Sequence, residues 1–465
     1  MDRRTFLIAS ASSLAIAGLV GCTNQTPPTP SPTATPSPAP ALVPEPAAFR
    51  RTAWSTDPFS RGAASFYATG SSPDDRVTLQ TAVDDRLFFA GEAVSANPGT
   101  VTGAIGSGRA AAQQVADLAV AGERIGVIGA GVAGLAAARA LADAGFEVAV
   151  IEARDRIGGR IHTVESDDWP FPIELGASFL RDGAVDPLVE ELTTSGLTVR
   201  ALPETVETRG PDGAVLEQPP GPAETVDAAV AWAAQGRRDV SVETAIAESG
   251  AGEVSTSGDI SEADWLAQYL HTQLAADVGA PPDELSAWYG VSEQAGDDQI
   301  VLGGMQAVLD REAEGLDVVT SSVVTRIVHT DAGVSLRLAT GQSLTVDRVI
   351  ITAPLGVLKS SAVEFEPPLP FDYRAAIDAL GMGGLEKVWL RFNDPFWQTT
   401  TALWRTVGTD ADFAMWVNMQ PFTGDPVLMG IATGDAARRV AEMSDDDVLR
   451  AARLSLEPFA LAPPQ

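Results

Sequence analysis

Three glycines between an apolar strand and a helix carry the clearest chemical signal in this sequence. Gly129, Gly131 and Gly134 stand in the spacing GxGxxG, directly after the apolar run at 124–128. This spacing allows a tight turn and lets a diphosphate approach the backbone at the N-terminus of the next helix. Glu152 ends the following apolar run, about 20 residues later, where an acidic side chain binds ribose hydroxyls. The pattern predicts a dinucleotide site on a Rossmann-like fold.

A second glycine pair follows this predicted site. Gly158 and Gly159 stand between Arg154 and Arg160, at a position where the chain has just left the second predicted strand. Two more glycines admit a second approach of the backbone to the diphosphate, and Arg160 is expected to add a charge-assisted contact.

The elements that position these residues can be predicted from periodicity. The sequence predicts a strand at 124–128, a helix that begins after the glycines, and a strand at 146–151. Apolar residues also recur at helical spacing through 101–118, where several glycines make the helix thin. This helix is expected to end near residues 121–122, which leaves a short joint to the first Rossmann strand.

Residues 125–160 resemble the opening of the flavin-containing amine oxidases, and the run 154–160 resembles the ExxxRxGGR extension of that family. Residues 50–112, which include RLFFAGEA at 86–93, resemble the way that family ends. In this chain, the segment that resembles the end of the family's sequences therefore precedes the segment that resembles their beginning. The resemblance implies a two-domain flavin amine oxidase fold, circularly permuted, with an α/β Rossmann-like FAD-binding domain plus an α+β substrate domain. The alternative is a fusion of fragments from two proteins, against which the lack of a second FFAGEA-type segment argues.

The resemblance implies FAD as the cofactor, bound non-covalently. Ala63 stands where covalently flavinylated relatives carry cysteine, and Cys22 is the only cysteine in the chain. Glu92 is implied to contact the ribityl chain, and the backbone of Val324 the adenine. The residues implied to bind FAD are Gly129, Gly131, Ala133, Gly134, Glu152, Ala153, Arg154, Gly158, Gly159, Arg160, Gly176, Ala177, Val324, Trp54, Gly91, Glu92, Thr100, Val101 and Ala104.

The catalytic residue implied by the resemblance is Lys387, one of only two lysines. In the family this lysine holds a water against flavin N5 and acts chiefly in reoxidation by oxygen. Many relatives also carry an aromatic pair before the flavin, and these positions match Ala64 and Thr100. Threonine at the second position resembles polyamine oxidases and the related histone demethylases, whereas alanine opens the aromatic cage. Phe66 or Tyr67 is the candidate to replace the missing ring.

The reaction implied is oxidation of a primary or secondary amine, polyamines included, with hydride transfer to N5 and release of hydrogen peroxide. The partners are then a small-molecule amine and oxygen. One alternative is an FAD-dependent desaturase or dehydrogenase, against which Lys387 argues. The other is a non-catalytic tethered flavoprotein, which the open aromatic cage leaves possible.

The N-terminal residues predict export and anchoring. Arg3 and Arg4 precede a short apolar run, as in twin-arginine signal peptides, and Cys22 ends a sequence that resembles a bacterial lipobox. We expect a lipoprotein on the outer face of the bacterial cell membrane, held to that membrane through its lipid anchor only. The twin-arginine route carries folded proteins, which suits a protein that binds its cofactor before export.

Charge and composition exclude two classes of partner. The net charge of −31 argues against nucleic acid. An acidic surface attracts cationic amines, and it equally serves solubility. His162, His271 and His329 lack metal-ligand spacing, so we expect no metal site.

The predicted organisation has five parts. They are a signal peptide at 1–22, a Pro/Thr/Ser-rich linker at 23–46, the permuted FAD-binding segment at 47–122, the FAD-binding domain at 123–200 and 300–355, and the substrate domain at 201–299 and 356–458.

Overall fold

The computed structural model describes residues 42–181, 187–194, 197–291 and 298–460. The predicted signal peptide, the lipid-anchor residue Cys22 and most of the predicted linker lie outside these ranges.

A five-stranded parallel sheet forms the centre of the nucleotide-binding half. In sheet order its strands are β13 (Val318–Val319), β5 (Glu147–Ile151), β4 (Arg124–Ile128), β17 (Arg348–Ile351) and β3 (Leu87–Phe89). Strand β3 pairs with β17, and β17 pairs with β4. The early segment that carries β3 therefore completes the sheet that carries the glycine-rich turn, and the predicted Rossmann-like fold is confirmed.

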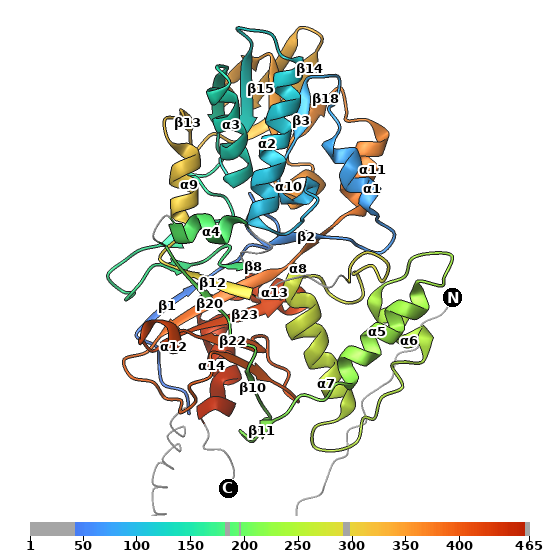
Figure 1. Cartoon of the computed structure of the whole chain (residues 1–465), viewed down its shortest axis with the longest axis vertical. Coiled ribbons are helices and arrows are strands. Elements are labelled where there is room, and N and C mark those ends of the chain that lie inside the picture. Colours follow the sequence, from blue (N-terminus) through green and yellow to red (C-terminus); the bar gives the residue numbers. More distant parts are fainter. Residues whose placement is uncertain (1–41, 182–186, 195–196, 292–297, 461–465) are drawn as a thin grey trace, which may run out of the picture. The chain divides into compact units, whose positions relative to one another are not determined.

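Two helices, one from the early segment and one from the segment after the glycine turn, cover this sheet together. Helix α2 (Val101–Leu118) lies against α3 (Val132–Asp143) (Figure 1). The two approach so closely that a Cβ on Gly108 would lie 2.1 Å from the carbonyl oxygen of Ala133. Only glycine permits this contact. Helix α2 ends a few residues before the predicted end.

A second sheet continues the nucleotide-binding half. Its strands, in sheet order, are β16 (Ser343–Val346), β15 (Gly333–Leu338), β14 (Val324–Thr330) and β18 (Glu364–Glu366). Helix α1 (Pro73–Gln80) packs on α11 (Phe371–Ala379), and both share a core cluster with β3. Residues 356–380 thus belong to this half, so the predicted start of the substrate domain at 356 is about 25 residues too early. Their apolar positions face the cluster of β3 rather than the other sheet.

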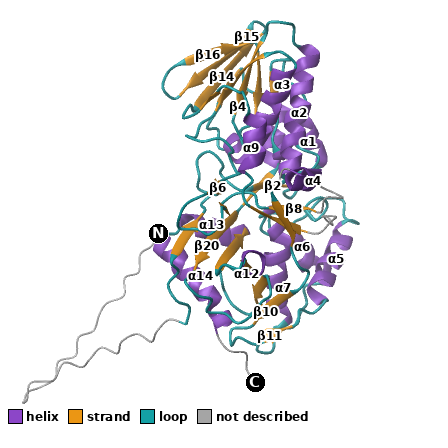
Figure 2. Cartoon of the chain, turned by 60° about the vertical axis from the view of Figure 1, so that its left-hand side comes forward, coloured by secondary structure: helices purple, strands orange, loops and turns teal. Residues whose placement is uncertain are grey.

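A seven-stranded sheet forms the other half, and Figure 2 shows it at the opposite end of the described residues from β14–β16. In sheet order its strands are β1 (Ala48–Arg51), β20 (Leu385–Arg391), β23 (Val427–Thr433), β22 (Met415–Asn418), β21 (Leu403–Thr406), β10 (Val206–Arg209) and β11 (Val215–Leu216). Helices α13 (Gly434–Glu442) and α14 (Asp445–Ala460) cover one face. Separate helices follow β11: α5 (Gly221–Ala233), α6 (Val242–Ser249), α7 (Glu262–Tyr269), the π-helical turn η2 (Leu270–Leu274) and α8 (Ala275–Val278).

The remaining elements are short. They are β2 (Ala64–Phe66) paired with β19 (Gly381–Gly383), β6 (Thr163–Val164) paired with β7 (Ile173–Glu174), the three-stranded sheet β8 (Phe179–Arg181), β12 (Asp298–Leu302) and β9 (Thr198–Ala201), and the helices η1 (Glu92–Val94), α4 (Pro187–Thr194), α9 (Gln306–Ala313), α10 (Leu355–Lys359) and α12 (Gln420–Thr423).

Two predicted boundaries at the start of the chain differ from the structure. Strand β1 pairs with β20, so residues 48–51 belong to the seven-stranded sheet and not to the FAD-binding half. Residues 42–46 are not linker, because Val43 is 1% exposed within the core under α14. Arg453 of α14 donates to the Val43 carbonyl and pairs with Glu45. The proline-rich composition masked the one apolar residue of this stretch that packs, Val43.

No helix within the described ranges has both the length and the apolar character needed to cross a bilayer.

Candidate active site

A cavity of about 750 Å³ runs between the parallel sheet and the seven-stranded sheet. Its volume lies in the upper part of the range for ligand sites, which suits a large cofactor together with a substrate. Early residues, from Trp54 to Ala104, and later residues, from Ile128 to Leu180, both line it. The two sequence segments therefore share one site.

Nearly all the residues predicted to bind FAD line this cavity. The exception is Gly134, where a Cβ would lie 1.9 Å from the Gly129 carbonyl oxygen. Its role is to let α3 pack on the glycine turn. A Cβ on Gly131 would meet nothing closer than 3.9 Å and would instead extend into the cavity. The turn thus leaves a cradle that a side chain would fill, which fits a bound diphosphate.

Glu152 closes the nucleotide end of the cavity. Its carboxylate accepts hydrogen bonds from the backbone of Ala130, at 2.7 Å, and of Arg154, at 2.8 Å. These contacts fix an acidic group at the end of β5, beside the glycine turn. The predicted position for an acid that binds ribose is therefore present.

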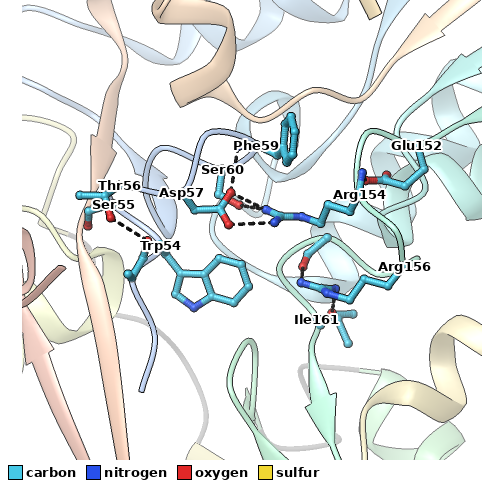
Figure 3. Close-up of polar contacts among 12 residues, drawn as sticks. Trp54, Ser55, Thr56, Asp57, Phe59, Ser60, Glu152, Arg154, Arg156 and Ile161 are labelled. Carbon is cyan, nitrogen blue, oxygen red and sulfur yellow. Dashed lines mark hydrogen bonds and ion pairs between the residues drawn. The ribbon is translucent and has the colours of Figure 1, made fainter. Parts of the chain in front are cut away.

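An ion pair that the sequence did not predict joins the two segments (Figure 3). Arg154 donates to both carboxylate oxygens of Asp57, at 2.8 and 2.7 Å, and to the hydroxyl of Ser60 at 2.9 Å. Burial raises the pKa of Asp57, but the hydrogen bond and charge of Arg154 outweigh it and hold that pKa below its usual value. Arg154 thereby holds the early loop against the end of β5.

A second ion pair joins the same segments. Arg160 donates to Glu92 at 2.9 Å and to the Ala63 carbonyl at 2.7 Å. Glu92 also accepts from the Ser65 hydroxyl and the Gly99 backbone. Burial raises the pKa of Glu92, but the charge of Arg160 and the Ser65 hydrogen bond outweigh it and lower that pKa.

The ion pair of Arg160 and Glu92 gives both residues a structural role that the sequence did not predict. Sequence reasoning expected Arg160 to bind the diphosphate and Glu92 the ribityl chain. Both side chains line the cavity, but each has the other as its partner because the two segments bring opposite charges together. The pair thereby holds the cavity wall, and the contacts of both residues with FAD stay predictions.

Lys387 projects from β20 into the cavity wall and is 3% exposed. Its Nζ donates to the Gly176 carbonyl at 2.5 Å and to the Ser178 hydroxyl at 2.6 Å. Burial lowers the pKa of the Lys387 ammonium to about 8, against the opposing charge of Glu174. The predicted lysine therefore lies at the cavity as a cation that titrates near neutrality.

The loop that carries Trp54 is held by Glu386, the residue before Lys387. This buried carboxylate accepts from the Thr52 hydroxyl and from the backbone of Trp54 and Ser55. The Trp54 indole donates to the Leu175 carbonyl at 3.1 Å. Trp54 thus forms a fixed wall of the cavity, and its contact with FAD stays a prediction. The sequence did not indicate its anchor, because a carboxylate in a strand has no distinctive spacing.

The predicted aromatic cage is open. Ala64 and Thr100 both line the cavity, and the Thr100 hydroxyl also caps α2 by accepting from Gly103. Phe66 does not reach the cavity: its ring packs against Gly381 in a buried cluster, so its predicted substrate role is wrong. The alternation of β2 turns Phe66 towards the helices α5–α7. The aromatic side chain that does line the cavity beside Lys387 is Phe179, whose ring centroid lies 5.3 Å from Nζ.

The far end of the cavity is formed by the seven-stranded sheet and the turn η2. Leu403, Arg405, Met415 and Val417 line it from the sheet, and Thr272 and Gln273 from η2. Sequence reasoning named none of these residues. Within the described ranges no group of three or more His, Cys, Asp or Glu side chains is arranged to hold a metal ion.

Comparison with known proteins identifies the class. The family model described as "Flavin containing amine oxidoreductase" matches residues 34–116 and 132–463. The chain therefore belongs to the flavin-containing amine oxidoreductase family. It is an FAD-dependent amine oxidase, and the glycine cradle described above fits that cofactor.

Individual relatives agree with this assignment. The chain is similar to polyamine oxidase 2 of Arabidopsis thaliana, at 32% identity over 69% of each chain. It is similar to polyamine oxidase 4 of rice, at 32% identity over 65% of this chain and 66% of that protein. It thus spans about two thirds of the length of these relatives. A lysine-specific histone demethylase 1 homologue of Arabidopsis is 28% identical over 66% of this chain.

Solved structures agree on the fold. Putrescine oxidase bound to putrescine aligns with a TM-score of 0.56 at 22% identity, over 73% of this chain and 81% of that one. This likeness confirms the two-domain flavin amine oxidase fold.

Proposed function

We propose that this protein oxidises a small primary or secondary amine at the cavity and passes the electrons to oxygen. The observation that carries the proposal is the buried Lys387 ammonium in the wall of a cavity that also holds the glycine cradle. The bound cofactor supplies the redox chemistry, namely hydride acceptance at N5 from the amine and formation of hydrogen peroxide on reoxidation. The relatives that are polyamine oxidases support an amine substrate.

The chain's own residues bind, orient and shield. Trp54 and Phe179 provide aromatic walls of the cavity, with Phe179 beside Lys387, and such walls would limit the access of water to a bound substrate. Lys387 holds a positive charge at the cavity through two hydrogen bonds to the opposite wall. A fixed charge in a site of low polarity favours the transfer of electrons to oxygen more strongly than it would in water.

A panel of amines added to the purified holoenzyme without oxygen tests this proposal. We expect bleaching of the flavin by at least one amine, followed by recovery of colour and formation of peroxide when air is admitted. Bleaching without peroxide would instead identify a dehydrogenase. A flavin that no amine bleaches would support the non-catalytic alternative.

We also propose that the chain is a circular permutation of its family. Both early and late segments contribute strands to one sheet and walls to one cavity. The first described residues also lie near the last helix of the chain, as a circular permutation requires. Arg453 contacts Val43, and α14 ends about 10 Å further along its axis.

A reordered protein tests the permutation. Residues 123–465 followed directly by 42–122 restore the usual order, and residues 42–465 in the present order are the control. The join begins at residue 42 because Val43 is part of the core. We expect both proteins to bind FAD equally. A reordered protein that is folded but holds no FAD would contradict the proposal.

For location, we propose export through the Arg3–Arg4 signal and lipid attachment at Cys22. The motifs in the sequence support this proposal. Cys22→Ala should move the protein from the membrane fraction to the soluble fraction. Membrane retention of that variant would contradict lipid anchoring at this residue.

A further inference from the structure

Four cavity-lining side chains form a row across the seven-stranded sheet. Lys387 of β20 pairs with Ile431 of β23, Ile431 with Met415 of β22, and Met415 with Arg405 of β21. Residues directly opposite each other across strands share one face of a sheet, and all four line the cavity. The row therefore has a cation at each end with two apolar side chains between them.

The far cation, Arg405, lacks the partner that a guanidinium in such a place normally has. Among the described residues no carboxylate lies within ion-pair distance of it, and its one hydrogen bond is to Oε1 of Gln218, at 3.3 Å. Burial lowers the pKa of Arg405 to about 10, against the opposing effect of Tyr269. A guanidinium carries five donors, so most of its capacity remains free. Arg405 is half-buried and none of its nitrogens is both buried and unpartnered, so its free donors are open to the cavity that it lines.

A second unsatisfied donor belongs to the same end of the cavity. Gln273 lines the cavity from η2, and its buried Nε2 has no hydrogen-bond partner among the described residues. Tyr269 stands one turn earlier on the same helix, and its pKa is raised by burial and by the charges of Asp227 and Asp277 against a lowering effect of Arg405. Side chains about four residues apart share a helix face, so Gln273 lies on the face that approaches Arg405. A single π-helical turn is a common device for placing a side chain in a functional site.

We propose that Arg405, assisted by Gln273, binds a carboxylate at the end of the substrate remote from the reacting amine. This inference rests on the proposed amine oxidation, and it narrows the substrate to an amine that also carries an acidic group. Two carboxylates, Asp277 and Asp298, line the cavity as well, and both have interaction partners of their own. A cavity with both signs of charge suits a zwitterion better than a plain polyamine.

The distance between Lys387 and Arg405, the two ends of the row, bears on the length of a substrate that could contact both. Three strand spacings separate Lys387 from Arg405, which places their backbones roughly 14 Å apart. The long Lys387 and Arg405 side chains shorten the gap between their charges, but an amine near Lys387 and a carboxylate at Arg405 still fit a molecule that carries the two groups far apart better than an α-amino acid, where they share one carbon. The substrate is therefore a long ω-amino acid or a comparable amine with a distant carboxylate.

Three amines of equal chain length test the proposal: ω-aminooctanoate, octylamine and α,ω-diaminooctane, which end in an anion, no charge and a cation. Wild type should show its lowest KM for ω-aminooctanoate. Arg405→Met should raise that KM about 10-fold or more, because a hydrogen bond to a charged group contributes about 1.5–3 kcal/mol. The KM for octylamine should hardly change. Arg405→Lys should restore part of the preference, and Arg439→Met, at an exposed ion pair in the same half, is the matched control.

Binding of a carboxylate that cannot be oxidised tests the carboxylate subsite independently of the proposed amine oxidation. Octanoate has no amine, so its binding to the oxidised holoenzyme, followed by the change in flavin absorbance, reports the carboxylate subsite alone. We expect binding to wild type, weaker binding to Gln273→Leu and loss of binding in Arg405→Met. If no amine is oxidised but octanoate binds in this pattern, the reaction fails and the subsite stands. If octanoate binds equally to all variants, or if Arg405→Met shifts the three KM values alike, the subsite is overturned.

Discussion

The two ends of the cavity are built from different parts of the polypeptide. The nucleotide end is mainly backbone, supplied by the glycine turn after β4 and by the loop after β5, within residues 128–160. The sheet end is made of side chains, which the neighbouring strands β20, β23, β22 and β21 supply. A cofactor common to a family can be held by backbone that tolerates few changes. Substrate choice is left to side chains that can change one at a time without disturbing the strands.

The largest effect should follow from a change at the nucleotide end. Gly134→Val would force a side chain into the space occupied by the Gly129 carbonyl, 1.9 Å from the new Cβ. We expect loss of nearly all bound FAD, measured as the ratio of flavin to protein absorbance after desalting. Gly106→Val is the matched control, because a Cβ there meets nothing within 4 Å. Normal FAD content in Gly134→Val would show that backbone packing does not decide cofactor binding.

The next effect should come from the sheet end. Lys387→Met should slow flavin reoxidation about 100-fold, the usual cost of removing one preorganised donor from a reacting centre, with little loss of FAD. Because the pKa of Lys387 is lowered to about 8, its positive charge is lost as pH rises through that value. Wild-type reoxidation should therefore slow above pH 8, and the variant should lack this step.

Lys359 is the control for this prediction. Its ammonium donates to three backbone carbonyls at the end of α11 and does not line the cavity. Lys359→Met should lower stability but leave the reoxidation rate and its pH dependence intact in stopped-flow traces. Equal slowing in both lysine variants would remove Lys387 from the reaction.

A moderate effect should follow from breaking the contact between the segments. Asp57→Asn removes the charge that Arg154 holds, and a partly buried pair of this kind contributes about 2 kcal/mol. Because the folded-state pKa of Asp57 is lowered, its stabilisation is present above about pH 3.8 and is lost as pH falls below that value. Denaturant titrations should show the variant less stable at neutral pH and less sensitive to acid. An unchanged midpoint at neutral pH would contradict this role.

The smallest effect is expected from removing the single thiol. Cys22→Ala should leave the flavin spectrum and content unchanged, because we expect FAD to be bound without a covalent bond. Ala63 stands where covalently flavinylated relatives carry cysteine, and Cys22 is the only cysteine in the chain. Acid precipitation of either protein should leave the yellow colour in the supernatant. Colour that remains with the pellet would show a covalent bond.

The sequence predicted the backbone-built end well and the side-chain end poorly, for a physical reason. The glycine turn, Glu152 and α2 are set by local spacing, which one stretch of sequence displays in full. The relation of Lys387 to Arg405 depends on the register of four strands, which no local pattern specifies. Phe66 illustrates the same limit: its aromatic character suggested a cage, but the alternation of β2 turned it into the core.

The predicted domain boundaries were wrong where they rested on amino-acid composition and not on contacts with other parts of the chain. Residues 42–46 were predicted as linker from their prolines, yet Val43 is buried under α14. Asp57 and Glu386 have no motif, and their importance comes from partners far away in the sequence. Such contacts are visible only once the fold has brought the segments together.

The placement of β1, β2 and β3 near the start of the chain has a consequence for synthesis. Hydrogen bonds beside these strands join residues that are 261 to 334 positions apart. On the ribosome, these three strands therefore lack their partners β17, β19 and β20 until residues 348–391 have been made. The nascent chain needs protection from pairing with its neighbours during that wait. The cavity that would hold the cofactor is complete only after these later strands have been made, and the proposed twin-arginine route would require such a folded protein.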